Sequence, residues 1–221
     1  MRVLIVAATQ AEVEPLMTSL GMQRSDEEEN LFVTRHVSVA NCSVLITGAG
    51  MVPTAFALAR HLPHNVYNVV INLGIAGSFD RNIPLGKVLE VYEDTFAELG
   101  AEDDKQFISI EKLGFGASIF KPTSAINHFT KKNFINKANA ITVNTVHGND
   151  DSIAAIVARF NPQLESMEGA AFFYACHKLH VPCIQIRAVS NYVEKRNRDN
   201  WDVPLAIKNL NNFALELIRE L

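Results

Sequence analysis

Three polar side chains stand where hydrophobic runs of the sequence end, and their types could bind or cleave a small molecule. Glu12 follows the run "RVLIVAA", Glu168 lies in "LESMEGAAFF", and Asn191 ends the run "VPCIQIRAVSN". A carboxylate can take a proton from water or accept hydrogen bonds from hydroxyl groups. An asparagine side chain offers a donor and an acceptor together. Their occurrence together favours a functional site.

Each of these residues also has an ordinary structural explanation. Glu12 falls in the first turn of an expected helix, where the helix dipole favours a carboxylate by roughly 0.3 to 1 kcal/mol. Glu168 precedes a hydrophobic helical segment and could serve as a capping partner. An asparagine such as Asn191 commonly ends a strand and starts a turn. For any one residue alone the structural explanation would be sufficient.

The apolar pattern predicts the elements that position these side chains. Near-continuous runs rich in Val and Ile are typical of strands buried on both faces, and they span residues 2–8, 68–77, 140–146 and 181–191. Helical patterns lie between them, one of which starts with Asp150 or Asp151 as its N-cap. Strands that alternate with helices predict an α/β fold with a mixed, largely parallel central sheet and helices on both sides. We expect one domain over residues 1–221.

Ligands of such sheets bind at the carboxyl ends of the strands. The residues found there include the glycine segments "GAGMVP" and "LGIAG". Neither segment matches G-x-G-x-x-G after a first strand, which makes a nicotinamide-dependent enzyme a poor interpretation. We expect tight turns at both segments, where a sugar or an anion could approach the backbone closely. Residues 98–139 show only weak periodicity.

The composition argues against several classes of protein. The chain has 221 residues, of which 48% are hydrophobic, and a formal net charge of −4. Without a Lys/Arg stripe, no nucleic-acid partner is expected. The cysteines Cys42, Cys176 and Cys183 lack metal-ligand spacing, so we predict reduced core residues and neither a metal nor a cofactor. Without a secretory or membrane segment, we expect a soluble, cytoplasmic protein that binds a small molecule.

Five segments, in order over nearly the whole chain, resemble the nucleosidase branch of the purine nucleoside phosphorylase superfamily. They are "AATQAEVEPL", "LITGAGMVPTAFAL", "VINLGIAGSF", "ESMEGAAFFYAC" and "VPCIQIRAVSN". The resemblance implies a three-layer sandwich that hydrolyses N-ribosidic bonds through an oxocarbenium-like sugar. It also implies a homo-oligomer in which a neighbouring subunit closes the 5′ end of the site.

The same resemblance implies roles for the candidate residues. Glu12 matches the residue that deprotonates the attacking water. Glu168 and Met167 match the pair that holds the ribose, whose hydroxyls donate to the carboxylate. Arg187 matches an arginine that orders the nucleophile site.

Further substrate contacts are expected from backbone segments. His147 and Gly148 fall where the family binds the base, and Gly74 belongs to the glycine segment at the sugar. Two departures from the family pattern affect the water site. Ile75 replaces a serine in the glycine segment, and Ser166 replaces a glutamate before the ribose-holding pair.

Asn191 stands where the adenine-cleaving members of this branch carry Asp. An amide can donate to O6 or N7 of a 6-oxopurine, so Asn191 favours hypoxanthine. The segments "RAVSNYVEKRNRDNW" and "VNTVHGND" resemble members that act on futalosine, a hypoxanthine nucleoside of menaquinone biosynthesis. The alternatives are a nucleosidase for 5′-methylthioadenosine, S-adenosylhomocysteine or inosine-like nucleosides, and a catalytically silent nucleoside-binding protein.

Overall fold

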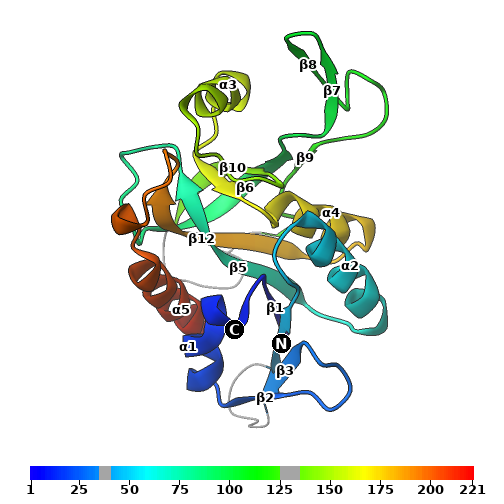
Figure 1. The fold of residues 1–221 in the computed structure, drawn as a ribbon. Coiled ribbons are helices and arrows are strands. Elements are labelled where there is room, and N and C mark those ends of the chain that lie inside the picture. Colours follow the sequence, from blue (N-terminus) through cyan, green and yellow to red (C-terminus); the bar gives the residue numbers. More distant parts are fainter. Residues whose placement is uncertain (35–40, 125–134) are drawn as a thin grey trace.

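Parallel strands built from the apolar runs form the centre of the main sheet. The computed structural model describes residues 1–34, 41–124 and 135–221. Four strands lie side by side in the order β4 (Asn41–Ile46), β1 (Arg2–Ala7), β5 (Val69–Ser78) and β12 (Cys183–Tyr192) (Figure 1). Because helices cover both faces of these strands, their sequences are apolar without alternation.

Antiparallel pairing at the margins makes the sheet mixed. Beyond β4, the sheet continues with β3 (Leu31–Thr34) and β2 (Met22–Arg24). Beyond β12, it continues with β6 (Val88–Phe96), β10 (Asn136–Thr142) and β11 (Leu164–Ser166), while β9 (Ile119–Phe120) pairs with β6. Strand β11 also pairs antiparallel with β5, so that β5, β12, β6, β10 and β11 close into a ring. This closure brings distant parts of the chain to β5.

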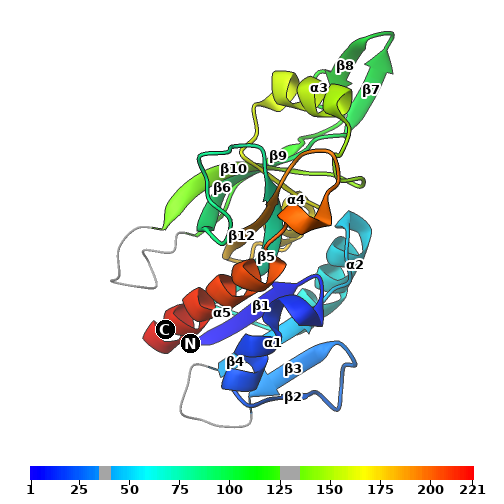
Figure 2. The same cartoon turned by 60° about the vertical axis from the view of Figure 1, so that its left-hand side comes forward.

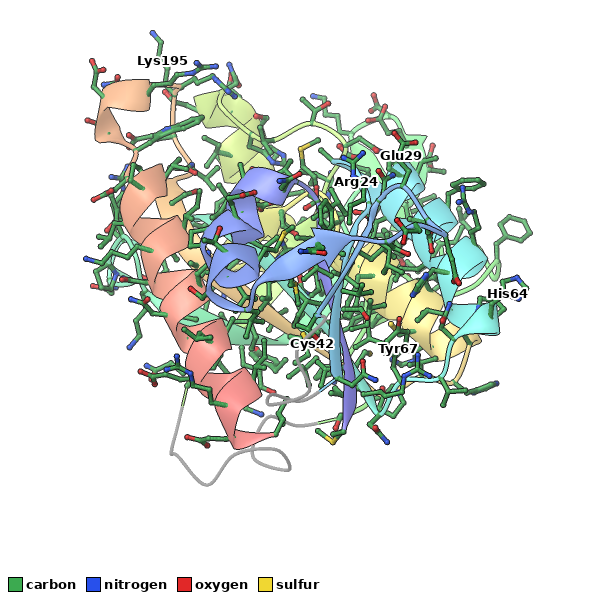
Figure 3. The ribbon with its side chains drawn as sticks, turned by 90° about the horizontal axis from the view of Figure 1, so that it is seen from below. Arg24, Glu29, Cys42, His64, Tyr67 and Lys195 are labelled. Atoms are coloured by element: carbon green, nitrogen blue, oxygen red, sulfur yellow. The ribbon has the colours of Figure 1, made fainter. Side chains whose placement is uncertain are left out.

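Helices form a layer on each side of the sheet. Helices α1 (Gln10–Ser19) and α5 (Val203–Glu220) lie on one side, and α2 (Met51–His61) and α4 (Gly169–Lys178) on the other (Figure 3). Short 3₁₀ turns, η1 (Leu62–His64) and η3 (Arg198–Asn200), follow α2 and precede α5. The predicted α/β sandwich with a mixed central sheet is confirmed. No helix in the described ranges is long and apolar enough to span a membrane.

Alternate residues of the central strands build two separate hydrophobic cores. On β5, Ile71 packs into the cluster beneath α1 and α5, which contains Leu16 and Leu210. The preceding residue, Val70, packs into the cluster beneath α2 and α4, which contains Phe172. Successive strand residues point to opposite faces, so one apolar run supplies both cores.

Some boundaries differ from the sequence predictions. Strand β10 spans Asn136–Thr142 instead of residues 140–146. Helix α3 (Asp150–Phe160) is capped by Asn149 and not by an aspartate, since the Asn149 side chain accepts from the backbone N–H groups of Asp151 and Ser152. The weakly periodic segment contains the hairpin β7 (Gly100–Asp103) and β8 (Gln106–Ser109), which projects with α3 beyond the sheet (Figures 1 and 2). Residues 125–134 of that segment lie outside the described residues.

Candidate active site

Three charged side chains meet at the carboxyl ends of the central strands. Glu12 lies in the first turn of α1, directly after β1, and Glu168 occupies the N-cap position of α4, after β11. Arg187 belongs to β12. Their exposed fractions are 8%, 6% and 1%, respectively. We call these three residues the carboxylate cluster. Charges buried this deeply are stable only when paired and hydrogen-bonded.

Arg187 is fixed by neighbours on the sheet and faces the carboxylates with its remaining nitrogen. Its Nε donates to Oε1 of Gln185 at 2.9 Å, and its Nη2 donates to Oδ1 of Asn72 at 2.6 Å. Nη1 lies 3.8 Å from Oε2 of Glu168. The guanidinium therefore has one fixed orientation, with its positive charge directed toward the cluster.

Gly74 makes room for this arrangement. A Cβ atom at this position would lie 2.1 Å from Nη1 of Arg187 and 3.2 Å from Oε1 of Glu12. The guanidinium and the carboxylate therefore both lie against the bare backbone of β5. Residues 74–77 continue the strand, as the apolar run over residues 68–77 predicts, so the tight turn expected at "LGIAG" is wrong. Gly74 is needed because the side chains of Arg187 and Glu12 lie in contact with the backbone of β5 at this position.

Glu12 accepts hydrogen bonds on both of its carboxylate oxygens. Oε2 accepts from the backbone N–H and the hydroxyl of Thr9, both at 3.0 Å, and Oε1 accepts from the backbone N–H of Ile75 at 3.1 Å. Burial raises the pKa of Glu12, while the Ile75 hydrogen bond and the charge of Arg187 act in the opposite direction. A carboxylate with a raised pKa is a better base toward water. The Thr9 contacts also form a capping box, so the structural explanation for Glu12 holds as well.

Glu168 is held by backbone groups from two directions. Its Oε1 accepts from the N–H of Gly50 at 2.9 Å, and its Oε2 accepts from the N–H of Met167 at 3.2 Å. Its side chain makes no capping bond to α4. The predicted pair of Met167 and Glu168 therefore lies at the cluster, with the carboxylate oriented by main-chain donors.

A buried acid behind the cluster escaped the sequence analysis. Asp94 on β6 accepts from the hydroxyl of Thr142 at 2.8 Å and from Nε2 of Gln185 at 3.0 Å. Gln185 in turn accepts from Arg187, so the network runs from Asp94 to the carboxylate cluster. Burial raises the pKa of Asp94 to about 6, against its hydrogen bonds to Gln185 and Thr142. The sequence signal for this network was the pair of polar residues Gln185 and Arg187 inside the apolar run "CIQIR".

A hollow lies farther along β5, between strands that the ring closure brings together. Gly77 pairs with Asn191 on one side and with Glu165 on the other. The hollow has a volume of about 210 Å³, and its lining residues are Gly77, Val146, His147, Gly148, Glu165, Asn191, Tyr192, Glu194, Arg196 and Trp201. We call it the Gly77 hollow. It brings Asn191, His147 and Gly148 together, as the sequence analysis had placed them near a base.

The carboxylate cluster and the Gly77 hollow lie at two positions along the same edge of the sheet, one at Gly74 and one at Gly77 of β5. We call these positions the two levels of the site. Arg187 pairs with Gly74, and Asn191 pairs with Gly77, three residues farther along β5. At about 3.3 Å per residue, the two levels are separated by roughly 10 Å. A register shift between Val189 and Asn191 marks a β-bulge, a feature that re-aims side chains beside active sites. The edge therefore suits a ligand with a hydroxyl-bearing part and a planar polar part.

Within residues 1–34, 41–124 and 135–221, no three His, Cys, Asp or Glu side chains are grouped so that they could hold a metal ion. The chemistry available at the described edge is that of carboxylates, an amide, an imidazole and a guanidinium.

Comparison with known proteins identifies the class to which this arrangement belongs. Residues 2–219 match the model of the phosphorylase superfamily. The chain belongs to this superfamily, and the resemblance drawn from its five segments is confirmed.

Among its relatives, the chain is similar to futalosine hydrolases. It is 30% identical to that of Streptomyces coelicolor over 84% of this chain and 82% of the relative. It is 28% identical to that of Thermus thermophilus over 80% of each chain. Its fold matches the native structure of futalosine hydrolase from Helicobacter pylori strain 26695 with a TM-score of 0.84 at 16% identity, covering 100% of this chain and 98% of that one.

Proposed function

We propose that the protein hydrolyses the N-ribosidic bond of futalosine, with release of hypoxanthine, as a step of menaquinone biosynthesis. The observation that carries the proposal is the two-level edge: a carboxylate cluster suited to a ribose lies about 10 Å from a hollow suited to a base. The similarity to futalosine hydrolases over most of the chain supports this substrate. The three free cysteines fit the reducing cytoplasm, which we assign as its compartment.

Glu168 is the group that holds the sugar. Its carboxylate is directed by the N–H groups of Gly50 and Met167, and its remaining acceptor positions can receive the 2′- and 3′-hydroxyls. Hydrogen bonds from hydroxyls to a carboxylate are charge-assisted and short. The guanidinium of Arg187 lies beside this carboxylate, with Nη1 3.8 Å from Oε2 of Glu168.

Glu12 is the general base that activates the attacking water. It reaches the cluster from α1 and lies beside the Gly74 backbone, against which Arg187 also rests. Phosphate is a poor nucleophile here, because an anion about 4 Å from an ionised carboxylate meets a repulsion of roughly 4 kcal/mol per unit charge at an effective dielectric of about 20. The reaction is therefore hydrolysis.

Asn191 contacts the base. Its Oδ1 accepts from the hydroxyl of Ser190 at 2.8 Å, and its Nδ2 donates to the carbonyl of Tyr192 at 3.0 Å. The Ser190 hydroxyl thereby sets the orientation of the amide, and the second hydrogen of Nδ2 remains for O6 or N7 of hypoxanthine. An amide is a weak acid, so the base leaves with the help of hydrogen bonding and not by full proton transfer from this residue.

Replacement of Glu12 by Gln tests the assignment of the base. We expect wild-type protein to release hypoxanthine from futalosine in phosphate-free buffer. The variant should lose about 10² to 10⁴-fold in kcat, because an amide cannot accept the proton of water. Chromatography of the free base gives the rate, and inosine and 5′-methylthioadenosine serve as competing substrates. The matched control is Glu14→Gln on the exposed face of α1, which should retain full activity.

The pH profile gives a second readout for the same residue. Glu12 must be ionised to act, and burial raises its pKa, so the acid limb of wild-type kcat/KM should lie above pH 4.5, the ordinary value for Glu. Activity falls as the pH drops through this limb. A strict requirement for phosphate, or full activity in Glu12→Gln, would contradict the proposal.

Replacement of Asn191 by Asp tests recognition of the keto edge. A carboxylate facing O6 would place two hydrogen-bond acceptors against each other. Such a mispaired buried polar group costs about 1 to 3 kcal/mol. We expect the ratio of kcat/KM for futalosine over its 6-amino analogue to fall at least tenfold. Asn197→Asp, which keeps an acceptor at the cap of η3, is the control. An unchanged ratio would show that the amide does not read the base.

We also propose that two copies of the chain associate through an apolar face on α2 and α4. Val52 and Phe56 are exposed on α2, Tyr174 on α4, and Phe115 on the adjoining loop. The face borders a cavity of about 680 Å³, and Met51 is among the residues that line it. Met51 directly follows Gly50, whose backbone N–H donates to Glu168. An exposed apolar patch of this kind is typical of an interface. A second copy seated there would close the site from outside.

Replacement of Phe56 by Glu tests the interface. Phe56 is 66% exposed, so the change should leave the fold intact, while a charge placed in an apolar interface should abolish association. Light scattering after size exclusion should give a multiple of 24.5 kDa for wild type and about 24.5 kDa for the variant. Val66→Glu, at a residue 78% exposed outside this face, is the control. A wild-type mass of 24.5 kDa would refute the proposal.

A further inference from the structure

The partly buried His147 and the buried Glu165 form a pair at the wall of the Gly77 hollow. Oε1 of Glu165 accepts from the backbone N–H of His147 at 2.9 Å, and Oε2 contacts Nδ1 of its ring. The side chains are 14% and 3% exposed. The ring also packs against Phe79, with centroids 6.4 Å apart. Both partners are therefore fixed in place before any ligand binds.

The contacts of Glu165 decide which ring nitrogen carries the hydrogen. An ionised carboxylate only accepts hydrogen bonds, so Nδ1 of His147 must be the donor to Oε2. In the neutral ring, Nε2 then has a lone pair and acts as an acceptor. Among the described residues, Nε2 has no hydrogen-bond partner. A second group orienting a histidine through its Nδ1 is a general device of functional sites.

The other wall of the hollow presents the opposite polarity. Asn191 lines the hollow with its NH₂ group beside Gly77, where an added Cβ would lie 3.3 Å from Nδ2 of Asn191. The hollow is thus lined by an amide donor on β12 and an imidazole acceptor held by β11. A 6-oxopurine offers the complementary pattern along two neighbouring edges that share O6: acceptors at O6 and N7, and a donor at N1–H.

We infer that His147 determines specificity, with its Nε2 accepting the N1–H of a 6-oxopurine while Asn191 donates to O6 or N7. The inference rests on the proposed function and deepens it. Adenine has a lone pair at N1, so it mismatches Nε2 of His147. Its 6-amino group is a donor, so it also mismatches the Asn191 amide where that amide donates to the 6-position, whereas N7 is an acceptor in both bases. Sites built around a required hydrogen bond reject the wrong analogue strongly. Glu165 is a positioning residue, because it acts by holding the tautomer of His147.

Replacement of Glu165 by Gln provides a sharp test. The backbone N–H of His147 still needs an acceptor. Only the oxygen of the introduced side-chain amide can fill that role, so the NH₂ group of the amide turns toward Nδ1 of His147. Nδ1 then accepts, and the ring hydrogen moves to Nε2, which becomes a donor. The variant keeps both contacts of the pair and is expected to fold. Its preference should shift from the N1–H of hypoxanthine toward the N1 lone pair of adenine.

The experiment compares kcat/KM for futalosine and its 6-amino analogue in wild type, His147→Phe and Glu165→Gln. We expect the ratio to fall about tenfold to a hundredfold in His147→Phe, which keeps an aromatic ring against Phe79, and further in Glu165→Gln. Glu93→Gln, outside the site, should leave the ratio unchanged. An unchanged ratio in Glu165→Gln, or an equal loss on both nucleosides, overturns the inference. Wild-type protein that cleaves neither nucleoside would instead refute the proposed function.

Discussion

The site depends on the electrostatic interaction of the buried Arg187 guanidinium with the carboxylates of Glu12 and Glu168. Two buried carboxylates repel each other, and a positive charge between them offsets that repulsion. Arg187 supplies that charge from the middle of the sheet, where Asn72 and Gln185 prevent it from rotating. Its position is possible only because Gly74 has no side chain. The fold therefore places a fixed positive charge where α1 and α4 begin.

The proposed function depends on the distance between the two levels along β5. The carboxylate cluster at Gly74 can bind hydroxyls and activate water, while the Gly77 hollow can read the hydrogen-bonding edge of a base. Sheet geometry sets the roughly 10 Å between them. The closed ring of strands brings β11 beside β5, so the chain contributes Glu165 to the same hollow as Asn191. A nucleoside bound along this edge would have its scissile bond between the two levels.

Much of this arrangement could be predicted from the sequence, because periodicity and strand ends are local properties. The central strands, the helices and the positions of Glu12 and Asn191 followed from such patterns. The partners of these residues could not be predicted in that way. Asp94 and Gln185 meet across 91 positions of the chain, and β11 is too short to show a period. The structural reason for Gly74 could not be predicted, because a close approach of side chains leaves no mark on the local sequence.

The central claim is that sugar and base occupy the two levels in this order. The most direct measurement is a crystal structure of the Glu12→Gln variant with futalosine bound. The account predicts the ribose hydroxyls on Glu168, the purine in the Gly77 hollow beside Asn191, and the glycosidic carbon facing residue 12. A purine ring bound outside the Gly77 hollow, or a ribose away from Glu168, would contradict it.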